Sequence, residues 1–422
     1  MNDTLLTLRE RGFIAQCSDI EGLSALMDAG SVTFYVGCDP TGASLHIGHI
    51  VPFFAFRHLR EAGHCGIALI GGGTARIGDP SGKTETRKML SYEQLDSNAA
   101  AIRGQLDRFL GGFDGKTAIC ANNKDWLAEL NYIDFLREIG RHFSVNRMLS
   151  FESYRLRMET GLSFIEFNYQ LLQSYDFLEL YRRYGCRLQI GGDDQWGNIV
   201  AGMELIRRVE GKASDSAGTA FALTFPLVTS SDGKKMGKTE KGAVFLDPEM
   251  TSPYDFFQYW RNVQDADIRR FLLMFTFLPG DECDRLCAQG ANPNAAKERL
   301  AWEVTALVHG KDEADRAISG AKAAFGKPGD AADRSSMPAK TLPAALFEAG
   351  VNIVDLFTEA GLCATKSEAR RLVQQGGAFV SGPDGILRAV SDVKTLVAAG
   401  NFKNNEIILR AGKKHFCRIV AD

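Results

Sequence analysis

Short apolar runs alternate with longer amphipathic stretches through the first half of the chain. The runs at 32–37, 66–70 and 187–190 have the length of buried strands, and the stretch at 47–61 has the spacing of a helix. Runs of glycine directly follow the last two of these strands. Strand, glycine turn and helix in repetition predict an α/β fold, in which helices cover both faces of a parallel sheet. Ligands of such folds bind at the carboxyl ends of the strands.

The pattern changes twice further along the chain. Residues 126–183 are almost wholly helical in pattern, which predicts an insertion in the sheet or a partner surface, and 252–325 is helical throughout. Glycine, proline and serine then predict a linker. The last 80 or so residues favour short helices, a strand at 378–380 and a hairpin around 411–412. The domains that we expect are a sheet domain with an insertion, a helical domain, a linker and a small terminal domain, at 1–228, 229–325, 326–342 and 343–422.

Composition narrows the class of protein. The 422 residues are 45% hydrophobic and 24% charged, with a net charge of −3, which is typical of a globular protein and excludes a generally basic nucleic-acid coat. The apolar runs are too short to span a bilayer, and the first residues lack the pattern of a signal peptide. Nine scattered cysteines predict a reduced, cytoplasmic protein without bound zinc. From Thr341 onward, 10 basic residues face 8 acidic ones, so the terminal domain is slightly basic.

The segment 39–49 carries the strongest chemical signal. It reads Asp-Pro-Thr-Gly-Ala-Ser-Leu-His-Ile-Gly-His, follows a strand and opens a predicted helix. The start of a helix attracts anions through its free N–H groups and its dipole. His46 and His49 are three residues apart and are expected to point to the same place, and Gly48 between them lets a nucleotide approach the backbone. A metal site is the alternative for paired histidines, but this segment offers no third ligand.

Two lysine-bearing loops add candidates for binding phosphate. Residues 231–239 form a loop with glycines and lysines, in which Lys235 and Lys238 could close on a leaving pyrophosphate. Residues 78–84 resemble a P-loop, but the first glycine of that motif is missing, because Ile77 stands in its place. A basic loop that only faces solvent is the alternative for either segment taken alone.

Together these segments resemble the HIGH and KMSKS signatures of the class I aminoacyl-tRNA synthetases. Residues 46–49 match the first signature letter for letter. Residues 235–239 read Lys-Met-Gly-Lys-Thr and depart from the second at its third and fifth letters, where serines are expected, while both lysines are present. Further segments, at 35–49, 78–83, 161–176 and 189–198, and the terminal domain resemble the bacterial tyrosyl members of the family. The resemblance covers essentially the whole chain.

The resemblance implies a fold and a function. It implies a Rossmann-like catalytic domain with a helical insertion, an α-helical domain near the anticodon arm, and an α+β RNA-binding domain of the ribosomal-protein S-four type. It further implies a homodimer that joins L-tyrosine to ATP and then passes the tyrosyl group to tRNA(Tyr). ATP enters with Mg²⁺, held mainly by the phosphates, and the resemblance implies no metal or organic cofactor bound by the protein.

The residues of one predicted helix support tyrosine as the substrate. Tyr169, Gln173 and Asp176 fall on one helical face among apolar neighbours, and buried polar groups need partners. Hydrogen bonding within the core is the alternative. With the resemblance, Asp176 accepts the phenolic O–H and Tyr35 assists it, while Tyr169 and Gln173 face the α-ammonium. The tyrosine-binding set so implied is Tyr35, Asp39, Asp79, Tyr169, Gln173, Asp176 and Gln195.

The resemblance also implies roles toward ATP. Thr41 and His46 stabilise the phosphates as charge develops, and Asp39 and Asp194 lie at the ammonium or the ribose. The catalytic set is Thr41, His46, Lys83, Arg87, Lys235 and Lys238. The ATP-binding set is Gly37, Asp39, Thr41, His46, His49, Gly192, Asp194, Lys235 and Lys238.

The terminal domain offers candidate contacts to RNA. Thr365 or Ser367 could cap a helix from which Lys366, Arg370 and Arg371 project together. With Lys413 and Lys414 of the predicted hairpin, these residues could bind tRNA phosphates. A solvated helix face is the alternative.

Three rival interpretations remain. A tryptophanyl-tRNA synthetase shares the fold but generally lacks the terminal domain, and the pair Tyr35 and Asp176 suits a phenol better than an indole. Another nucleotidyltransferase with a HIGH-like motif would not need the terminal domain. A non-catalytic RNA-binding or regulatory protein that keeps the synthetase fold would not need His46, His49, Lys235 and Lys238, and all four are present.

Overall fold

The chain forms two compact units. The computed structural model describes residues 1–81, 89–211, 220–233, 236–239, 242–325, 337–412 and 415–422, without the side chains of 153, 160, 238, 239 and 323–325. The first unit comprises Met1–Thr251 and Asn262–Leu300, and the second comprises Ser252–Arg261 and Ala301–Asp422. The four domains expected from the sequence stay a prediction.

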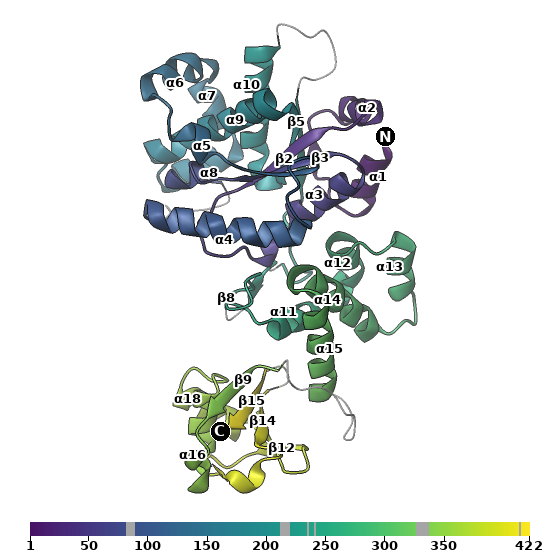
Figure 1. Cartoon of the computed structure of the whole chain (residues 1–422), viewed down its shortest axis with the longest axis vertical. Helices are drawn as coiled ribbons and strands as arrows, with labels where there is room; N and C mark the ends of the chain where they lie inside the picture. Colours follow the sequence, from purple (N-terminus) through teal and green to yellow (C-terminus); the bar gives the residue numbers. More distant parts are fainter. Residues whose placement is uncertain (82–88, 212–219, 234–235, 240–241, 326–336, 413–414) are drawn as a thin grey trace. The chain divides into compact units, whose positions relative to one another are not determined.

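A six-stranded sheet forms the centre of the first unit (Figure 1). Its strands are β1 (Gln16–Cys17), β2 (Thr33–Cys38), β3 (Cys65–Ile70), β4 (Ala118–Asn122), β5 (Cys186–Gly192) and β6 (Phe221–Phe225). They lie in the order β1-β6-β5-β2-β3-β4, and all pairs are parallel except β1 with β6. The chain runs outward from β2 to β3 and β4 and then returns to the other side of β2 at β5. The carboxyl ends of β2 and β5 are therefore the topological switch point of the sheet.

Helices cover both faces of this sheet, as the sequence pattern predicts. They include α1 (Asp3–Glu10), α2 (Ile20–Ala29), α3 (Val51–Glu61), α4 (Tyr92–Leu110), α9 (Phe164–Tyr184) and α10 (Trp196–Glu210). Successive β2 side chains point to opposite faces. Phe34 meets Phe56 of α3 with ring centroids 5.0 Å apart, and Tyr35 meets Phe177 of α9 at 5.2 Å. Thus α3 and α4 pack on one face, and α9 and α10 on the other (Figure 1).

The stretch between β4 and β5 is helical, as predicted for residues 126–183. It contains α5 (Lys124–Leu127), α6 (Tyr132–Glu138), η3 (Gly140–His142), α7 (Val145–Ser150), α8 (Glu152–Thr160) and α9. Several large apolar side chains of this stretch are exposed, among them Ile133 and Phe164, each 68% exposed. The stretch thus combines a packed helix, α9, with an apolar outer surface.

Short elements complete the first unit. They are η1 (Ile47–His49), η2 (Thr74–Arg76), η4 (Asp193–Gln195), β7 (Lys238–Thr239), β8 (Gly242–Ala243), η5 (Asp265–Asp267), α12 (Ile268–Phe275) and α13 (Gly280–Leu286), and α14 (Pro293–His309) crosses the division between the units. The single helix predicted over 47–61 is thus wrong in detail, because η1 is a 3₁₀ turn and α3 starts at Val51. Pro52 has no N–H to donate to the carbonyl of Gly48, so an α-helix cannot run through this point without losing a hydrogen bond.

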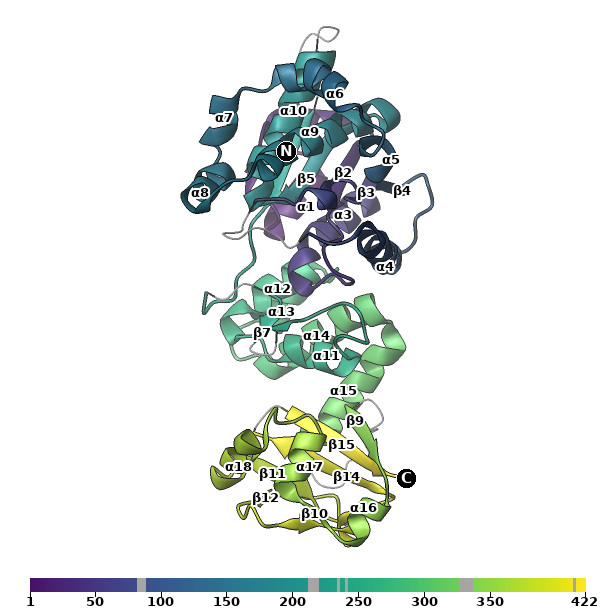
Figure 2. The ribbon, with the colours of Figure 1, turned by 90° about the vertical axis from the view of Figure 1, so that its left-hand side faces the viewer.

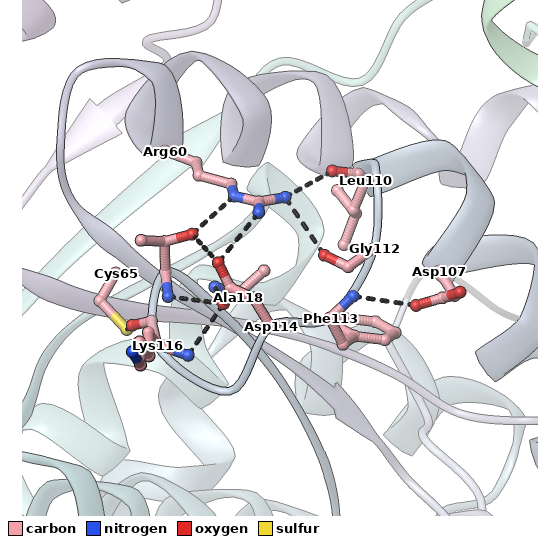
Figure 3. A network of polar contacts seen from close by, with 10 residues as sticks. Arg60, Cys65, Asp107, Leu110, Gly112, Phe113, Asp114, Lys116 and Ala118 are labelled. Carbon is pink, nitrogen blue, oxygen red and sulfur yellow. Dashed lines mark hydrogen bonds and ion pairs between the residues drawn. The ribbon is translucent and has the colours of Figure 1, made fainter.

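A polar network fixes the end of the sheet that lies away from the switch point (Figure 3). The Arg60 guanidinium donates to the carbonyls of Leu110 at 2.7 Å and Gly112 at 3.3 Å, and to the Thr117 hydroxyl at 2.9 Å. Asp114 accepts from that hydroxyl and from three backbone N–H groups, which together hold the pKa of its carboxyl well below the usual range. The network satisfies the last carbonyls of α4 and ties α3 to the start of β4.

The second unit contains a separate α+β core (Figure 2). Its five-stranded sheet has the order β12 (Leu387–Val390), β11 (Ala378–Ser381), β14 (Glu406–Ala411), β15 (His415–Ala421) and β9 (Ala339–Leu342). Other elements are α11 (Pro253–Arg261), α15 (Lys311–Phe325), α16 (Ala345–Glu348), β10 (Val351–Asn352), α17 (Ile353–Glu359), α18 (Lys366–Gln374), β13 (Leu396–Val397) and η6 (Ala399–Asn401). The predicted strand at 378–380 and hairpin around 411–412 are confirmed as β11 and as β14 with β15. Over the described parts of the chain, no helix has the length and apolarity that crossing a bilayer requires.

Candidate active site

A cavity of about 300 Å³ opens at the carboxyl ends of β2 and β5, at the switch point. Residues from β2, the turn after it, α9 and the end of β5 line it. The residues predicted from the sequence that line it are Tyr35, Gly37, Asp39, Thr41, His49, Asp79, Tyr169, Gln173, Asp176, Gly192, Asp194 and Gln195. The fold thus brings most of the predicted tyrosine and ATP residues to one place.

Asp176 forms the buried end of the cavity. Its carboxylate accepts from the Asn123 amide at 2.8 Å and from the Trp126 indole N–H at 2.7 Å. Burial raises the pKa of Asp176 to about 8, the two hydrogen bonds oppose this shift, and the charge of Asp39 adds to it. Asp176 is therefore mostly in its neutral form at neutral pH.

Asp39 lies beside this end and is held from two elements. Its carboxylate accepts from the Thr74 hydroxyl at 2.7 Å and from the Tyr169 hydroxyl at 3.1 Å. Asn123 also donates to the Thr74 hydroxyl, at 2.9 Å, so the half-buried Asp39 and the buried Asp176 are joined through Asn123 and Thr74. A carboxylate with hydroxyl groups beside it can bind a cationic group such as an α-ammonium.

Three polar atoms of the cavity wall are buried without a hydrogen-bond partner among the described residues. They are the Tyr35 hydroxyl and the side-chain carbonyl oxygens of Gln173 and Gln189. Buried polar atoms without partners cost free energy, and native proteins contain few of them. Their presence in one cavity indicates a polar ligand that supplies a donor to the amide oxygens and a partner to the phenol.

His49 lines the cavity, and His46, which is not among the lining residues, lies beside it. His46 caps η1 by accepting from the N–H of Gly48 at 3.0 Å, and the two imidazole rings stack with centroids 3.6 Å apart. The expectation that the two side chains point to the same place is confirmed. A Cβ on Gly48 would come within 2.9 Å of the His46 ring and 3.2 Å of the Met236 carbonyl oxygen. The position requires glycine because of these close neighbours.

The second signature packs against the first. A Cβ on Gly237 would lie 3.0 Å from the Gly48 nitrogen. The N–H of Ile47 donates to the carbonyl of Val244 at 3.0 Å, and that of Leu246 donates to Leu45 at 2.9 Å. Two segments far apart in the sequence therefore converge. Lys83, Arg87 and Lys235 lie outside the described residues, as does the side chain of Lys238.

Asp79 and Gln195 border the cavity on another side. The Gln195 amide donates to the Asp79 carboxylate at 2.8 Å, and the Ser81 N–H donates to the same carboxylate at 2.9 Å. Gln195 closes η4 directly after the end of β5, so the strand that ends at the switch point delivers it to the site. This pair presents an amide and a carboxylate side by side.

Sequence reasoning missed three polar residues of the cavity wall, which are Thr74, Asn123 and Gln189. Thr74 follows the glycines after β3, Asn123 follows β4 directly, and Gln189 lies within β5. For Thr74 and Asn123 the available signal was a place at the end of a parallel strand, but only the strand order brings them together with Gln189. Within the residues that the structure describes, no group of three or more His, Cys, Asp or Glu side chains could hold a metal ion.

The RNA-contact candidates lie on α18. Thr365 caps this helix by accepting from the N–H of Glu368, which confirms one of the two predicted caps. Lys366, Arg370 and Arg371 are exposed, and Lys366 forms an ion pair of 2.7 Å with Asp355. Lys413 and Lys414 lie outside the described residues. The role of all five in binding RNA stays a prediction.

Comparison with known proteins finds relatives that match the whole chain. The sequence profile of "tRNA synthetases class I (W and Y)" matches residues 27–326. A "Tyrosine--tRNA ligase" of Treponema denticola is 60% identical over 421 residues, which covers 100% of both chains. The same-named protein of Treponema pallidum is 58% identical over 423 residues and covers 100% of this chain and 99% of its own.

Solved structures resemble the chain over about three quarters of its length. A C-terminally truncated mitochondrial tyrosyl-tRNA synthetase of Aspergillus nidulans has a TM-score of 0.70 and 30% identity, and the match covers 76% of this chain and 94% of that one. A tryptophanyl-tRNA synthetase of Encephalitozoon cuniculi has a TM-score of 0.55 and 14% identity, and the match covers 74% of this chain and 87% of that one. The second likeness is one of fold alone.

Proposed function

The chain belongs to the class I tRNA synthetases of the tryptophan and tyrosine group and functions as a tyrosine–tRNA ligase, and we propose that the cavity at the ends of β2 and β5 is its active site. There L-tyrosine reacts with ATP to give tyrosyl-adenylate and pyrophosphate, and the tyrosyl group then passes to the 3′ end of tRNA(Tyr). The observation that carries this assignment is one cavity whose lining includes both the buried carboxyl of Asp176 and His49, on which the His46 ring stacks.

Tyrosine is proposed to bind with its ring toward Asp176. The phenolic hydroxyl of the substrate donates to Asp176, and the unpartnered hydroxyl of Tyr35 supplies a second hydrogen bond. The α-ammonium lies near Asp39, Tyr169 and Gln173, and Asp79 and Gln195 lie toward the backbone of the amino acid. A site built to bind a hydroxyl rejects the analogue that lacks it, a rule of which tyrosine-specific synthetases are themselves a standard example.

Activation needs positioning more than acid–base chemistry. The substrate carboxylate is already ionised, so it attacks the α-phosphorus in line without a general base, and pyrophosphate leaves. His46 and Thr41 stabilise the charge that develops on the phosphates. Gly37, Gly192 and Asp194, at the ends of the two strands that flank the cavity, border the nucleoside together with His49 of η1.

Lysine and arginine side chains are proposed to bind the leaving pyrophosphate. They are Lys83 and Arg87 from one loop and Lys235 and Lys238 from the other. The backbone at Met236 and Gly237, which adjoins both lysines of the second loop, packs against the HIGH segment and supports their placement at the phosphates. ATP enters as its Mg²⁺ complex, with the metal held mainly by the phosphates.

Partners and location extend the proposal. Exposed apolar side chains of the insertion, including Tyr132, Ile133 and Phe164, support a homodimer that buries this surface. The exposed cations of α18, with Lys413 and Lys414, are proposed to bind phosphates of tRNA. We place the enzyme in the cytoplasm, where its substrates are made and where nine free cysteines stay reduced.

One assay tests the proposed function against its rivals. Exchange of labelled pyrophosphate into ATP is measured with each of the twenty amino acids, with and without tRNA. Tyrosine alone is expected to support exchange, without a need for tRNA. Exchange with tryptophan in place of tyrosine would transfer the assignment to the indole branch, and an absence of exchange with every amino acid would contradict an enzyme.

A further inference from the structure

Asn198 lies directly behind the active site. It belongs to α10 and is 2% exposed, and it is not among the residues that line the cavity. Its side-chain nitrogen donates to the side-chain carbonyl oxygen of Gln195 at 3.0 Å and to the Ser81 hydroxyl at 3.2 Å. A carboxamide nitrogen carries two hydrogens, so both donors of Asn198 are used.

These hydrogen bonds belong to a closed ring that passes through four residues. Asn198 donates to Gln195, Gln195 donates to Asp79, and Asp79 accepts the N–H of Ser81, whose hydroxyl accepts from Asn198. The direction of each bond is determined. If the Gln195 amide turned over, its oxygen would face the Asp79 carboxylate and its nitrogen would face the Asn198 donors.

The start of α10 is itself held in place. The Gln170 amide donates to the carbonyl of Gly197 at 3.2 Å, and a Cβ on Gly197 would lie 2.9 Å from the Phe151 ring. Tyr154 lies in the same region. Its hydroxyl accepts the N–H of Gln170. Burial raises the pKa of Tyr154, and the charge of Asp79 raises it further. Asn198 therefore projects from backbone that is packed on several sides.

We propose that Asn198 is a positioning residue that sets the orientation of the Gln195 amide and of the Asp79–Ser81 turn, and thereby the affinity for the amino-acid substrate. The inference rests on the proposed function, which assigns Asp79 and Gln195 to tyrosine. It adds that their arrangement depends on a donor that does not touch the substrate. It also ties the tyrosine site to the segment that leads directly to Lys83.

Asn198→Asp tests the direction of the bonds, because it keeps the shape and replaces two donors by an acceptor. The new carboxylate faces the Gln195 oxygen, and burial near Asp79 raises its pKa above that of an exposed aspartate. We expect kcat/KM for tyrosine in pyrophosphate exchange at pH 8 to fall tenfold to about a hundredfold, as is usual when buried polar groups lose their partners. Protonation restores one donor, so the deficit relative to the unmodified enzyme should shrink by at least about threefold at pH 6.

Matched variants separate positioning from general damage. Asn198→Ala should raise the KM for tyrosine about fivefold or more, with a pH profile parallel to that of the unmodified enzyme and a KM for ATP within about twofold. Asn131→Asp, an isosteric change at the exposed cap of α6, should leave all parameters unchanged, because aspartate caps helices as well as asparagine. Active-site titration normalises each rate to the folded enzyme.

The outcomes are distinct. The inference is overturned by a KM for tyrosine in Asn198→Ala equal to that of the unmodified enzyme, whether or not Asn198→Asp folds. It is equally overturned by a folded Asn198→Asp whose deficit is constant from pH 6 to pH 8. Failure of the unmodified enzyme to catalyse tyrosine-dependent exchange would instead overturn the proposed function.

Discussion

At the scale of single residues, the site is built around carboxyl groups whose surroundings differ. Asp176 is buried and accepts from an amide and an indole, whereas Asp79 accepts from an amide and a backbone N–H at the cavity border. Burial raises the pKa of Asp176 to about 8, so this carboxyl is mostly neutral at pH 7. A neutral carboxyl keeps an oxygen that accepts hydrogen bonds, so it can still bind a phenol as an acceptor.

Asp176→Asn should change how stability depends on pH. Between about pH 4 and pH 8 the folded chain keeps a proton on Asp176 that the unfolded chain has lost, so the free energy of unfolding falls as the pH rises through this window. The slope from one such group is at most about 1.4 kcal/mol per pH unit. Urea unfolding at pH 5, 6, 7 and 8 should give a flatter profile for the variant. Asp134→Asn, at an exposed site of α6, should keep the original slope.

His46→Ala tests the division of roles within the cavity. His46 caps η1 beside the second signature and is remote in sequence from the residues that hold Asp176. The rate of tyrosyl-adenylate formation should fall about a hundredfold, since a group that acts on developing charge is lost, while the dissociation constant for tyrosine stays within about twofold. Lys238→Ala should behave alike. Rapid-quench measurements give the rate and equilibrium dialysis gives the affinity, and a collapse of tyrosine binding would refute this assignment.

At the scale of elements, the sequence predicted what a strand's own pattern encodes. The apolar runs at 32–37 and 187–190 became β2 and β5 to within two residues, because both lie in the middle of the sheet and are buried on two faces. The edge strands β1 and β4 were not predicted, since pairing with neighbours stabilises them more than their own composition does. Strand β6 was not predicted either, although all five of its residues are buried in the sheet. Asn123 and Thr74 were missed for the same reason, because only the order of β3 and β4 places them beside Asp176.

The junction of α8 and α9 carries a separate prediction. Glu166 and Ser163 form a capping box at the start of α9. Glu166 also forms an ion pair of 2.9 Å with Arg157, and both Glu166 and Arg157 are almost fully buried. Glu166→Ala leaves the Arg157 charge buried without this partner, so the first unit should lose about 3 kcal/mol or more of stability in urea unfolding. Replacing both residues, with Arg157→Met and Glu166→Leu, should cost less than Glu166→Ala alone. A larger loss in the double variant would contradict the account of an uncompensated charge.

At the scale of the whole molecule, the reaction depends on segments that the chain keeps far apart. Residues 46–49 and 236–237 meet at Gly48, where neither segment leaves room for a side chain on the other. The family resemblance anticipated this meeting, whereas composition and periodicity could not, because nothing in a local pattern says which distant loop will contact a given turn. The terminal sheet, by contrast, has its own buried core, from Leu342 to Ile419, and so can carry a separate task.

Removal of the terminal domain tests that separation. Truncation after about residue 339 would cut into β9, which begins at Ala339 and pairs with β15, so the shortened chain is better ended at Phe325, the last residue of α15. Because every residue that lines the cavity lies before this point, tyrosine-dependent pyrophosphate exchange should stay within about twofold of the full chain. Charging of tRNA(Tyr) should fall by about two orders of magnitude or more, since the cations of α18 and the hairpin are lost.

A full-length variant with Arg370→Ala and Arg371→Ala, which keeps the sheet, should show a smaller fall of charging that grows with salt concentration. Unimpaired charging by the truncated chain would remove the RNA role from this domain and assign tRNA binding to residues 1–325.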